Sequence, residues 1–318
     1  MIWRALTGPM PKTVLMIAAV MITLVGSTVF CEESAQEAAT ARTPARRALF
    51  VGVQDYHAPE LSLMGVRDDV RLLADALIAR GAFASEDLKV LLDGHATRSN
   101  ILKTFKEWLI DDTKPGDTVF FHFNGRDCPV WDEKAEDIDA GRHVALIPCD
   151  GMKKADAERR TLQGRSGTAF VRDAIENVIP DYELAEMLRQ LRGRTVVLIC
   201  DTSDFVRHVE VEGGALIAFS AAKRHHFPYI VVFQCAPEGH HSVFTWYLLK
   251  GFEGKADLNQ DGSITFSELA RFMEEGIVSG GYQQTPQHLF IPESAGEKTF
   301  FTTAPRERVP RAEAEQVQ

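Results

Sequence analysis

Apolar segments of strand length alternate with amphipathic segments along most of this chain. The segment GVRDDVRLLADALIARG (65–81) carries apolar residues at positions i, i+3, i+4 and i+7, which is the spacing of an amphipathic helix. Further helical patterns cover 99–110, 182–191 and 244–252. The segments of strand length are RALFVGV (47–53), LKVLL (88–92), TVFFHF (118–123), HVALIPC (143–149), TVVLIC (195–200) and YIVVFQC (229–235).

The predicted strands are apolar at successive positions instead of alternating with polar residues. Such strands are typical of a sheet that is covered on both faces, and their alternation with helices predicts an α/β fold with a doubly wound, mostly parallel sheet. Ligands of such folds bind beyond the carboxyl ends of the strands. We therefore expect the residues that follow the strands to share one rim there, namely 55–56, 124–128, 149–150 and 200–204.

Residues 1–31 have the pattern of an export segment. Arg4 and Lys12 precede a 17-residue apolar run, as in a secretory signal peptide. A single membrane anchor is the alternative, because this run has the minimum length of a helix that spans a bilayer. Both alternatives predict that the rest of the chain is exported (periplasmic or extracellular) or anchored to the membrane by this segment. A polar linker (32–45), the folded domain (46–292) and a polar tail (293–318) follow.

Charge and motifs exclude several classes of function. The formal net charge of −10 argues against nucleic acid as a partner, since phosphate binding requires a basic surface. The sequence lacks the glycine-rich loops of nucleotide sites and the G-x-S-x-G motif of α/β-hydrolases. We expect no organic cofactor. The cysteines of the folded part permit disulfides if the chain is exported, but we favour small buried residues at strand ends. These are Cys128, Cys149, Cys200 and Cys235.

The segments at the predicted rim resemble the caspase and metacaspase group of cysteine peptidases, particularly bacterial caspase-like domains. The resemblance covers roughly residues 46 to 290, and the matching segments occur in the family's order. They include RRALFVGVQDYHAPELSLMGVRDDVRLLADAL, PGDTVFFHF, TVVLICDTS and HHSVFTWYLLKGFEGKADLNQDGSITFSEL. The resemblance implies a caspase–haemoglobinase-like fold of three layers, αβα, and the family's activity is that of a cysteine endopeptidase.

The family's reaction needs a histidine, a cysteine nucleophile and an oxyanion site. By the resemblance, Arg126 occupies the histidine position, and Asp127 replaces the glycine that follows it. Ser203 occupies the position of the nucleophile. A serine hydroxyl without a base is a poor nucleophile. We therefore predict a peptidase homologue that has lost activity, a pseudopeptidase with a binding or regulatory role.

Two alternatives stay open. The chain could be an active caspase-type or metacaspase-type endopeptidase that cleaves after a basic residue through a relocated nucleophile, or a structural module of the cell envelope. His122 and Cys200 are the candidates for relocated groups. However, His122 lies within an apolar strand pattern and Cys200 takes the last strand position, so we expect both to be buried.

Two aspartates match the acidic residues that receive a basic side chain in metacaspases. They are Asp150 and Asp201, and this resemblance implies a peptide or protein partner with basic residues. Alternatively, these aspartates cap helices. In a third possibility Arg126 pairs with Asp127, Asp201 or Asp204 and fills the cleft as an internal ion pair.

The segment DLNQDGSITFSE (257–268) fits an EF-hand calcium loop. Such a loop needs alternating oxygen donors, a glycine at the sharp turn and a closing glutamate. Thr265 and Glu268 also fit a capping box for the next helix, which is the alternative without metal. We expect Ca²⁺ in a structural role, bound by Asp257, Asn259, Asp261, Ser263 and Glu268.

Overall fold

The computed structural model describes residues 42–131, 142–153, 161–163, 169–171, 175–203, 211–222 and 241–302. The chain divides into two units, Met1–Pro44 and Ala45–Gln318, and every helix and strand of the described ranges belongs to the second unit. Among the helices in these ranges, none is long and apolar enough to cross a membrane. The predicted export segment (1–31) and the strand predicted at 229–235 lie outside the described residues.

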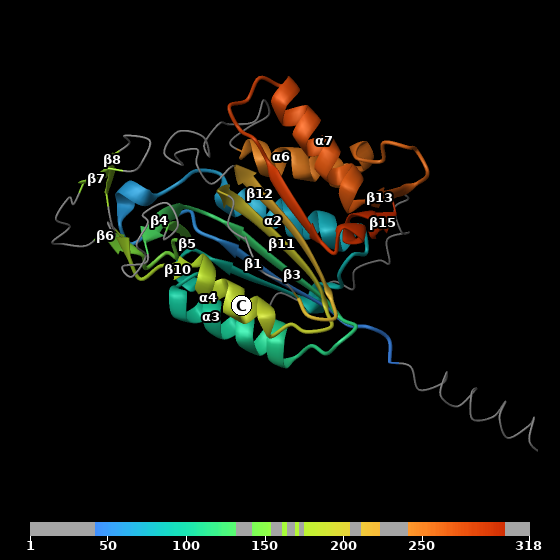
Figure 1. Cartoon of the computed structure of the whole chain (residues 1–318), viewed down its shortest axis with the longest axis horizontal. Coiled ribbons are helices and arrows are strands. Elements are labelled where there is room, and N and C mark those ends of the chain that lie inside the picture. Colours follow the sequence, from blue (N-terminus) through green and yellow to red (C-terminus); the bar gives the residue numbers. More distant parts are fainter. Residues whose placement is uncertain are drawn as a thin grey trace, which may run out of the picture. The chain divides into compact units, whose positions relative to one another are not determined.

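A six-stranded sheet forms the centre of the second unit, with the strand order β14-β12-β11-β3-β1-β2 (Figure 1). Five strands are parallel and the edge strand β14 is antiparallel to β12. The bounds are β1 Arg46–Gly52, β2 Leu88–Leu92, β3 Thr118–Asn124, β11 Thr195–Ser203, β12 Ala215–Ala222 and β14 Gln287–Ile291. The predicted α/β fold with a mostly parallel sheet is confirmed.

Helices cover both faces of this sheet (Figure 1). One layer contains α2 Val66–Ala79, α6 Val243–Lys250 and α7 Phe266–Ser279. The other contains α3 Arg98–Thr104, its π-helical continuation η4 Phe105–Asp111, and α4 Asp181–Arg189. These helices correspond to the four helical segments predicted from the sequence and, for α7, to the helix expected after the acidic loop.

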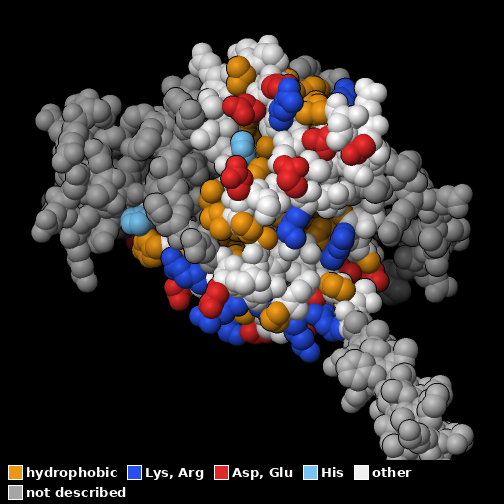
Figure 2. Space-filling view, turned by 45° about the vertical axis from the view of Figure 1, so that its right-hand side comes forward, with side chains coloured by type: hydrophobic (Ala, Val, Ile, Leu, Met, Phe, Trp, Pro, Cys, Tyr) orange, Lys and Arg blue, Asp and Glu red, His pale blue; other side chains and the backbone are white. Residues whose placement is uncertain are grey.

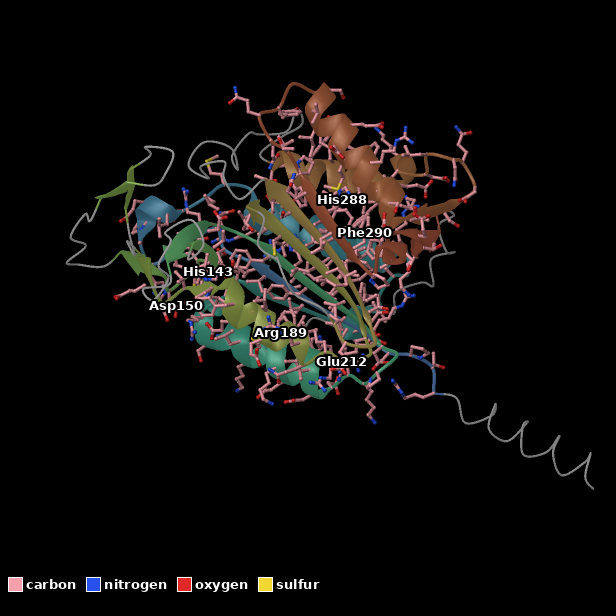
Figure 3. All side chains as sticks on the ribbon, in the orientation of Figure 1. His143, Asp150, Arg189, Glu212, His288 and Phe290 are labelled. Carbon is pink, nitrogen blue, oxygen red and sulfur yellow. The ribbon has the colours of Figure 1, made fainter. Side chains whose placement is uncertain are left out.

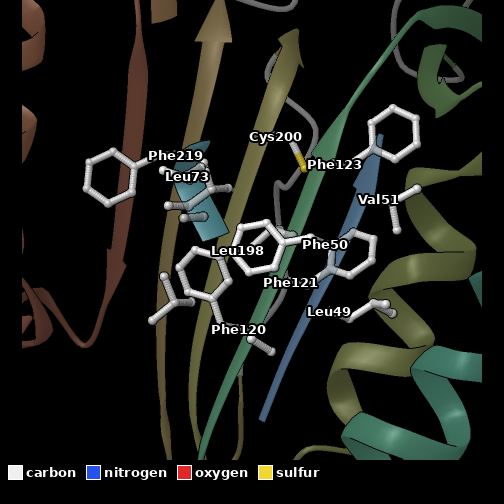
Figure 4. Packing of buried hydrophobic residues seen from close by; sticks show 14 of the residues in the cluster. Leu49, Phe50, Val51, Leu73, Phe120, Phe121, Phe123, Leu198, Cys200 and Phe219 are labelled. Carbon is white, nitrogen blue, oxygen red and sulfur yellow. The ribbon is translucent and has the colours of Figure 1, made fainter. Parts of the chain in front are cut away.

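The sheet is apolar on both faces because a helical layer packs on each. Along β3, Phe121 faces η4, where its ring centroid lies 5.2 Å from that of Phe105. Phe120 faces the opposite layer, and its ring stacks on Phe50 of β1 at 5.2 Å. Figure 4 shows these side chains around the strands. Successive apolar residues along a strand therefore supply two cores.

Two predictions about elements need correction, and one strand was missed. The segment 143–149 lies outside the main sheet, because β5 pairs antiparallel with β4 and β10 in a sheet of its own. Strand β12 was not predicted, since its sequence ALIAFSAA is rich in small residues. The folded part also extends past residue 292, because β15 pairs with β13 and Phe300 is buried.

The smaller elements surround the main sheet. The short strands are β4 Asp127–Trp131, β5 Arg142–Leu146, β6 Met152–Lys153, β7 Thr161–Gln163, β8 Ala169–Val171, β9 Ile175–Glu176, β10 Ile179–Pro180, β13 Ser263–Thr265 and β15 Thr299–Thr302. The short helices are η1 Pro59–Leu61, η2 Ser85–Asp87, η3 Asp93–His95, η5 Gly251–Lys255 and η6 Glu293–Glu297. On the face that Figure 2 shows, Lys and Arg side chains lie among Asp and Glu side chains.

Candidate functional site

The carboxyl ends of β1, β3 and β11 lie side by side. Gly52 pairs with Asn124, and Asn124 pairs with Asp201 on the other side. The segment after β5 joins this rim through the backbone, because the N–H of Ile147 donates to the carbonyl of Arg126 at 2.9 Å. The N–H of His57 likewise donates to the carbonyl of Cys149 at 2.8 Å. The segments that were expected to share one rim therefore meet there as far as the structure describes them.

Arg126 is bound to the loop that follows β1. Its backbone N–H donates to the hydroxyl of Tyr56 at 2.7 Å, and its Nε–H donates to the carbonyl of Leu61. Tyr56 is buried, and this burial raises the pKa of its hydroxyl above the ordinary range. The preceding Gly125 has no space for a side chain, since an added Cβ would lie 2.9 Å from the Tyr56 hydroxyl. The loop thus holds the guanidinium of Arg126 half-buried at the rim.

Asp127 and Ser203 stand on two different elements of the rim. Asp127 begins β4, where it pairs with Leu146 and is half-buried. Ser203 ends β11, and its backbone pairs with Ala222 after an irregularity in the register. The side chain of Ser203 and the whole of Asp204 lie outside the described residues.

Asp201 is fully buried on the face of the sheet that α6 covers. Its Oδ2 accepts hydrogen bonds from the hydroxyls of Ser242 and Thr245, the latter at 2.8 Å. Burial raises the pKa of Asp201 to about 7, and the nearby negative charge of Asp69 adds to the rise. The two hydroxyls act in the opposite direction because they stabilise the ionised carboxylate. Asp201 is thus a carboxylate that changes its charge near neutral pH.

Asp69 and His241 complete this buried cluster, and neither residue was predicted as part of the site. Asp69 Oδ1 lies 2.6 Å from His241 Nδ1, and its Oδ2 accepts the N–H of Ser242 at 2.9 Å. Asp69 is 1% exposed, and burial raises the pKa of its carboxyl to about 6. A signal was present, because Asp69 falls on the same helical face as the apolar Val66 and Val70.

Asp150 contacts the N-terminus of a helix on the opposite face of the sheet. Its Oδ1 accepts the backbone N–H of Arg98, the first residue of α3, at 2.8 Å. Asp150 and Arg189, the last residue of α4, are labelled in Figure 3. Asp150 therefore accepts a backbone N–H at the beginning of α3, as the helix-capping alternative requires. Asp201 instead accepts the hydroxyls of Ser242 and Thr245, and the N-cap of α6 is Ser242 itself.

The candidates for a relocated catalytic dyad are deeply buried. His122 is 0% exposed, and this burial lowers the pKa of its imidazole to about 3. Neither of its ring nitrogens has a hydrogen-bond partner among the described residues. Cys200 is also buried, which raises the pKa of its thiol above the ordinary range. Burial raises the pKa of Cys149 to about 11, with the negative charge of Asp150 adding to the rise.

The described cysteines lie in the interior of the protein. Cys128, Cys149 and Cys200 are all buried, in agreement with the expectation of small buried residues at strand ends. Cys235 lies outside the described residues.

The acidic loop 257–268 has side chains that bind its own backbone. Asp257 accepts the N–H groups of Asp261 at 3.1 Å and Gly262 at 3.0 Å, and Gly262 has a positive φ of 83°. Glu268 forms a capping box with Thr265 at the start of α7. Within the described ranges, no group of three or more His, Cys, Asp or Glu side chains is close enough to hold a metal ion. The turn of an EF-hand-like loop is therefore present, with Glu268 engaged at a helix N-terminus.

Sequence comparison relates part of the chain to known proteins. Residues 46–162 match the family described as "Metacaspase, peptidase C14 domain". Over 123 residues, 37% of this chain, the sequence is 30% identical to Metacaspase-6 and 34% identical to Metacaspase-7 of Arabidopsis thaliana. Over 111 residues, 33% of this chain, it is 30% identical to Metacaspase-1 of Schizosaccharomyces pombe. These matches cover 33%, 30% and 25% of the three relatives, so the chain spans a third or less of their length.

A solved structure shares the fold at low sequence identity. The crystal structure of protein GSU0716 from Geobacter sulfurreducens has a TM-score of 0.54 and 15% identity, and the match covers 78% of this chain and 93% of that one. The Drosophila initiator caspase Dronc has a TM-score of 0.44 and 10% identity, with coverages of 77% and 78%.

The six-stranded sheet and its two helical layers define an α/β fold that this chain shares with protein GSU0716. Residues 46–162, which include β1, β2 and β3 of this sheet, are similar to the metacaspase, peptidase C14 domain.

Proposed function

We propose that this protein is a catalytically inactive peptidase homologue that binds or regulates a peptide or protein partner. The carrying observation is Arg126, which stands where the family resemblance puts the catalytic histidine. A guanidinium keeps its proton at any pH at which proteins are folded, so it cannot accept one from a nucleophile. Its Nε–H donates to the carbonyl of Leu61, and its backbone to Tyr56, so it is part of the architecture of the rim.

The burial of the alternative groups supports the same proposal. A general base must reach its proton at hydrogen-bond distance, and its pKa should lie near the working pH. His122 is enclosed and its pKa is lowered to about 3. A cysteine nucleophile reacts as the thiolate, whereas burial raises the pKa of Cys200. Neither group is suited to replace the dyad.

The partner that we propose carries basic residues, by analogy with the resemblance at Asp150 and Asp201. The buried cluster supports an acidic character of the rim, because Asp69 adds a second carboxylate beside Asp201. Both carboxylates already accept hydrogen bonds from the N-terminal region of α6. A basic side chain would therefore have to displace Ser242 or His241 to reach them.

Two further roles are part of the proposal. The loop 257–268 binds Ca²⁺ as a structural ion, supported by the turn at Gly262 and the convergence of Asp257 and Asn259 on the N–H of Asp261. Ser263 and Glu268 would complete the oxygen donors, although Glu268 now caps α7. We also propose that residues 1–31 export the chain or anchor it to the membrane.

Peptide cleavage tests the proposed loss of activity. Fluorogenic peptides with Arg or Lys before the cleavage site should stay intact with the unmodified protein. The paired variant Arg126→His with Ser203→Cys restores the residue types of the dyad, and each single change is the matched control. Cleavage by the unmodified protein that disappears on changing a rim residue such as Asp201→Ala would contradict the proposal. Binding of the same peptides, measured by fluorescence anisotropy, would then separate a binding role from a purely structural one.

A further inference from the structure

The second edge of the main sheet, β2, has an open side. β2 pairs with β1 in parallel, and no other described strand pairs with it. The edge is accessible, since Lys89 and Val90 are exposed and Val90 keeps 40% of its surface. An edge strand leaves backbone N–H and C=O groups without partners, so it can pair with another extended chain.

A groove runs between this edge and α2. Its volume is about 570 Å³, and its lining includes Arg67, Arg71, Val90, Leu92, Asp93 and His95. Val90 and Leu92 form an apolar floor, and the turn after β2 closes one end. The groove therefore offers both apolar and polar side chains, as a bound strand with alternating side chains requires.

The cations of the groove differ in what they already bind. Arg67 forms ion pairs with Asp55 and Asp93, so its charge is compensated. Arg71, one helical turn further along α2, is exposed and forms no hydrogen bond or ion pair with another described residue. Arg71 is therefore a cation available to a ligand.

Basic side chains flank the edge strand on both faces. His95 is exposed at the end of the groove. On the opposite face of β2, the Nζ of Lys89 lies 4.1 Å from the ring centroid of Trp108. Arg71 and Lys89 are thus cations on the two faces of this edge, whereas the whole chain has a formal net charge of −10. A second copy of the chain would bring like charges together at this edge, whereas an acidic segment would be attracted.

We propose that the edge of β2 binds an extended acidic peptide segment of a partner protein as an added strand. The backbone of the segment pairs with β2. Its alternating side chains place carboxylates near Arg71 and apolar groups over Val90 and Leu92. Arg126 and Asp201 of the rim do not line this groove, so the proposal does not depend on whether the rim binds or cleaves peptides.

A short labelled peptide tests the proposal with the full chain. The probe is an acetylated and amidated peptide of about six residues with alternating Glu and Val, compared with one in which Lys replaces Glu. Fluorescence anisotropy should show saturable binding of the Glu peptide and little binding of the Lys peptide. No binding of the Glu peptide up to about 1 mM, or equal binding of both peptides, would overturn the proposal.

Variants of the protein locate the binding. Arg71→Glu should weaken binding of the Glu peptide about tenfold, because it replaces an attraction with a repulsion. The charge-matched control is Arg189→Glu on α4 (Figure 3), which should leave binding unchanged. Both arginines are exposed, so circular dichroism and the melting temperature should match those of the unmodified chain. Binding that survives Arg71→Glu intact would place the peptide elsewhere.

Backbone pairing has its own readout. In a strand, the N–H groups of every second residue point to the neighbouring strand. Of two peptides, one N-methylated at the odd positions and one at the even positions, one should therefore lose binding and the other should keep it. Equal binding of both methylated sets would refute strand addition. Size-exclusion chromatography checks the alternative occupant, since a dimer that Arg71→Glu dissociates would mean that a second copy covers this edge.

Discussion

Replacing Asp201 with asparagine tests the electrostatic state of the rim. The carboxylate is fully buried and accepts hydrogen bonds from the hydroxyls of Ser242 and Thr245. Its Oδ1 has no partner among the described residues. Asparagine has the same shape and keeps one oxygen for the two hydroxyls, but it cannot ionise. The substitution therefore removes the charge and leaves the packing in place.

The magnitude follows from the pKa of the carboxyl. Burial raises the pKa of Asp201 in the folded protein from 3.8 to about 7, which corresponds to about 4 kcal/mol. Because the pKa of Asp201 is higher in the folded than in the unfolded state, protonation of Asp201 favours the folded state. This stabilisation is fully present below pH 3.8 and is lost as the pH rises through about 7. Ionisation of Asp201 thus destabilises the unmodified protein at high pH. The free energy of unfolding of Asp201→Asn, relative to that of the unmodified protein, should therefore rise by roughly 3 kcal/mol between about pH 5 and about pH 8.

The titration of His122 also changes the stability with pH, so Asp201→Asn and the unmodified protein must be compared at each pH. Burial lowers the pKa of its imidazole from 6.5 to about 3. A lowered pKa in the folded state contributes stability above pH 6.5 that is lost as the pH falls toward 3. His122 and Asp201 therefore have opposite effects between these values, and a single pH profile would show little. Because His122 is present in both proteins, its contribution cancels in the difference.

Urea unfolding at several pH values between about 5 and 8 gives the free energy of unfolding of both proteins. Asp75→Asn on the exposed side of α2 is the matched control for the loss of one carboxylate. If the difference between Asp201→Asn and the unmodified protein does not change with pH, Asp201 does not titrate in this range, and the reasoning from its burial fails.

Three other changes address other parts of the molecule. His122→Leu should stabilise the protein by about 1 kcal/mol, because two buried ring nitrogens without partners are removed; a lower urea midpoint would contradict this. Asp150→Ala should lower the free energy of unfolding by about 1 kcal/mol through the loss of the acceptor for the Arg98 N–H, with Asp150→Asn as the milder control. Ca²⁺ should raise the melting temperature of the unmodified protein but not that of Asp257→Ala, and an equal response to Ca²⁺ and to a chelator would count against the calcium site.

The pattern of apolar residues was sufficient to predict the main sheet but not every strand in it. Strands such as β3 are recognisable because both of their faces are buried, which leaves an unbroken apolar run. The segment 143–149 has the same appearance, yet β5 pairs with β4. Strand pairing depends on contacts between distant segments, and the apolar character of a single segment does not specify its neighbours. For the same reason ALIAFSAA, with its small side chains, was overlooked as a central strand.

The candidate site was predictable in its location and less so in its contacts. Parallel strands bring their carboxyl ends together, so the rim followed from the fold. The partners of Asp201 did not, because Ser242 and Thr245 lie more than 40 residues away in the chain and reach it only through the packing of α6. Asp69 was concealed for a related reason: a single aspartate next to a second one, Asp68, is ordinary in the first turn of a helix.

The contacts of the rim also bear on how a basic ligand could bind there. In an empty binding pocket for a guanidinium the carboxylates would be exposed to solvent, whereas Asp69 and Asp201 are buried and already hydrogen-bonded. Burying such a pair costs free energy unless the charges are compensated, and the hydroxyls and His241 supply part of that compensation. To bind there, the basic group of a ligand would have to stabilise the two carboxylates more than the hydroxyls and His241 do. The beginning of α6 is therefore the element whose displacement any basic partner of the rim must bring about.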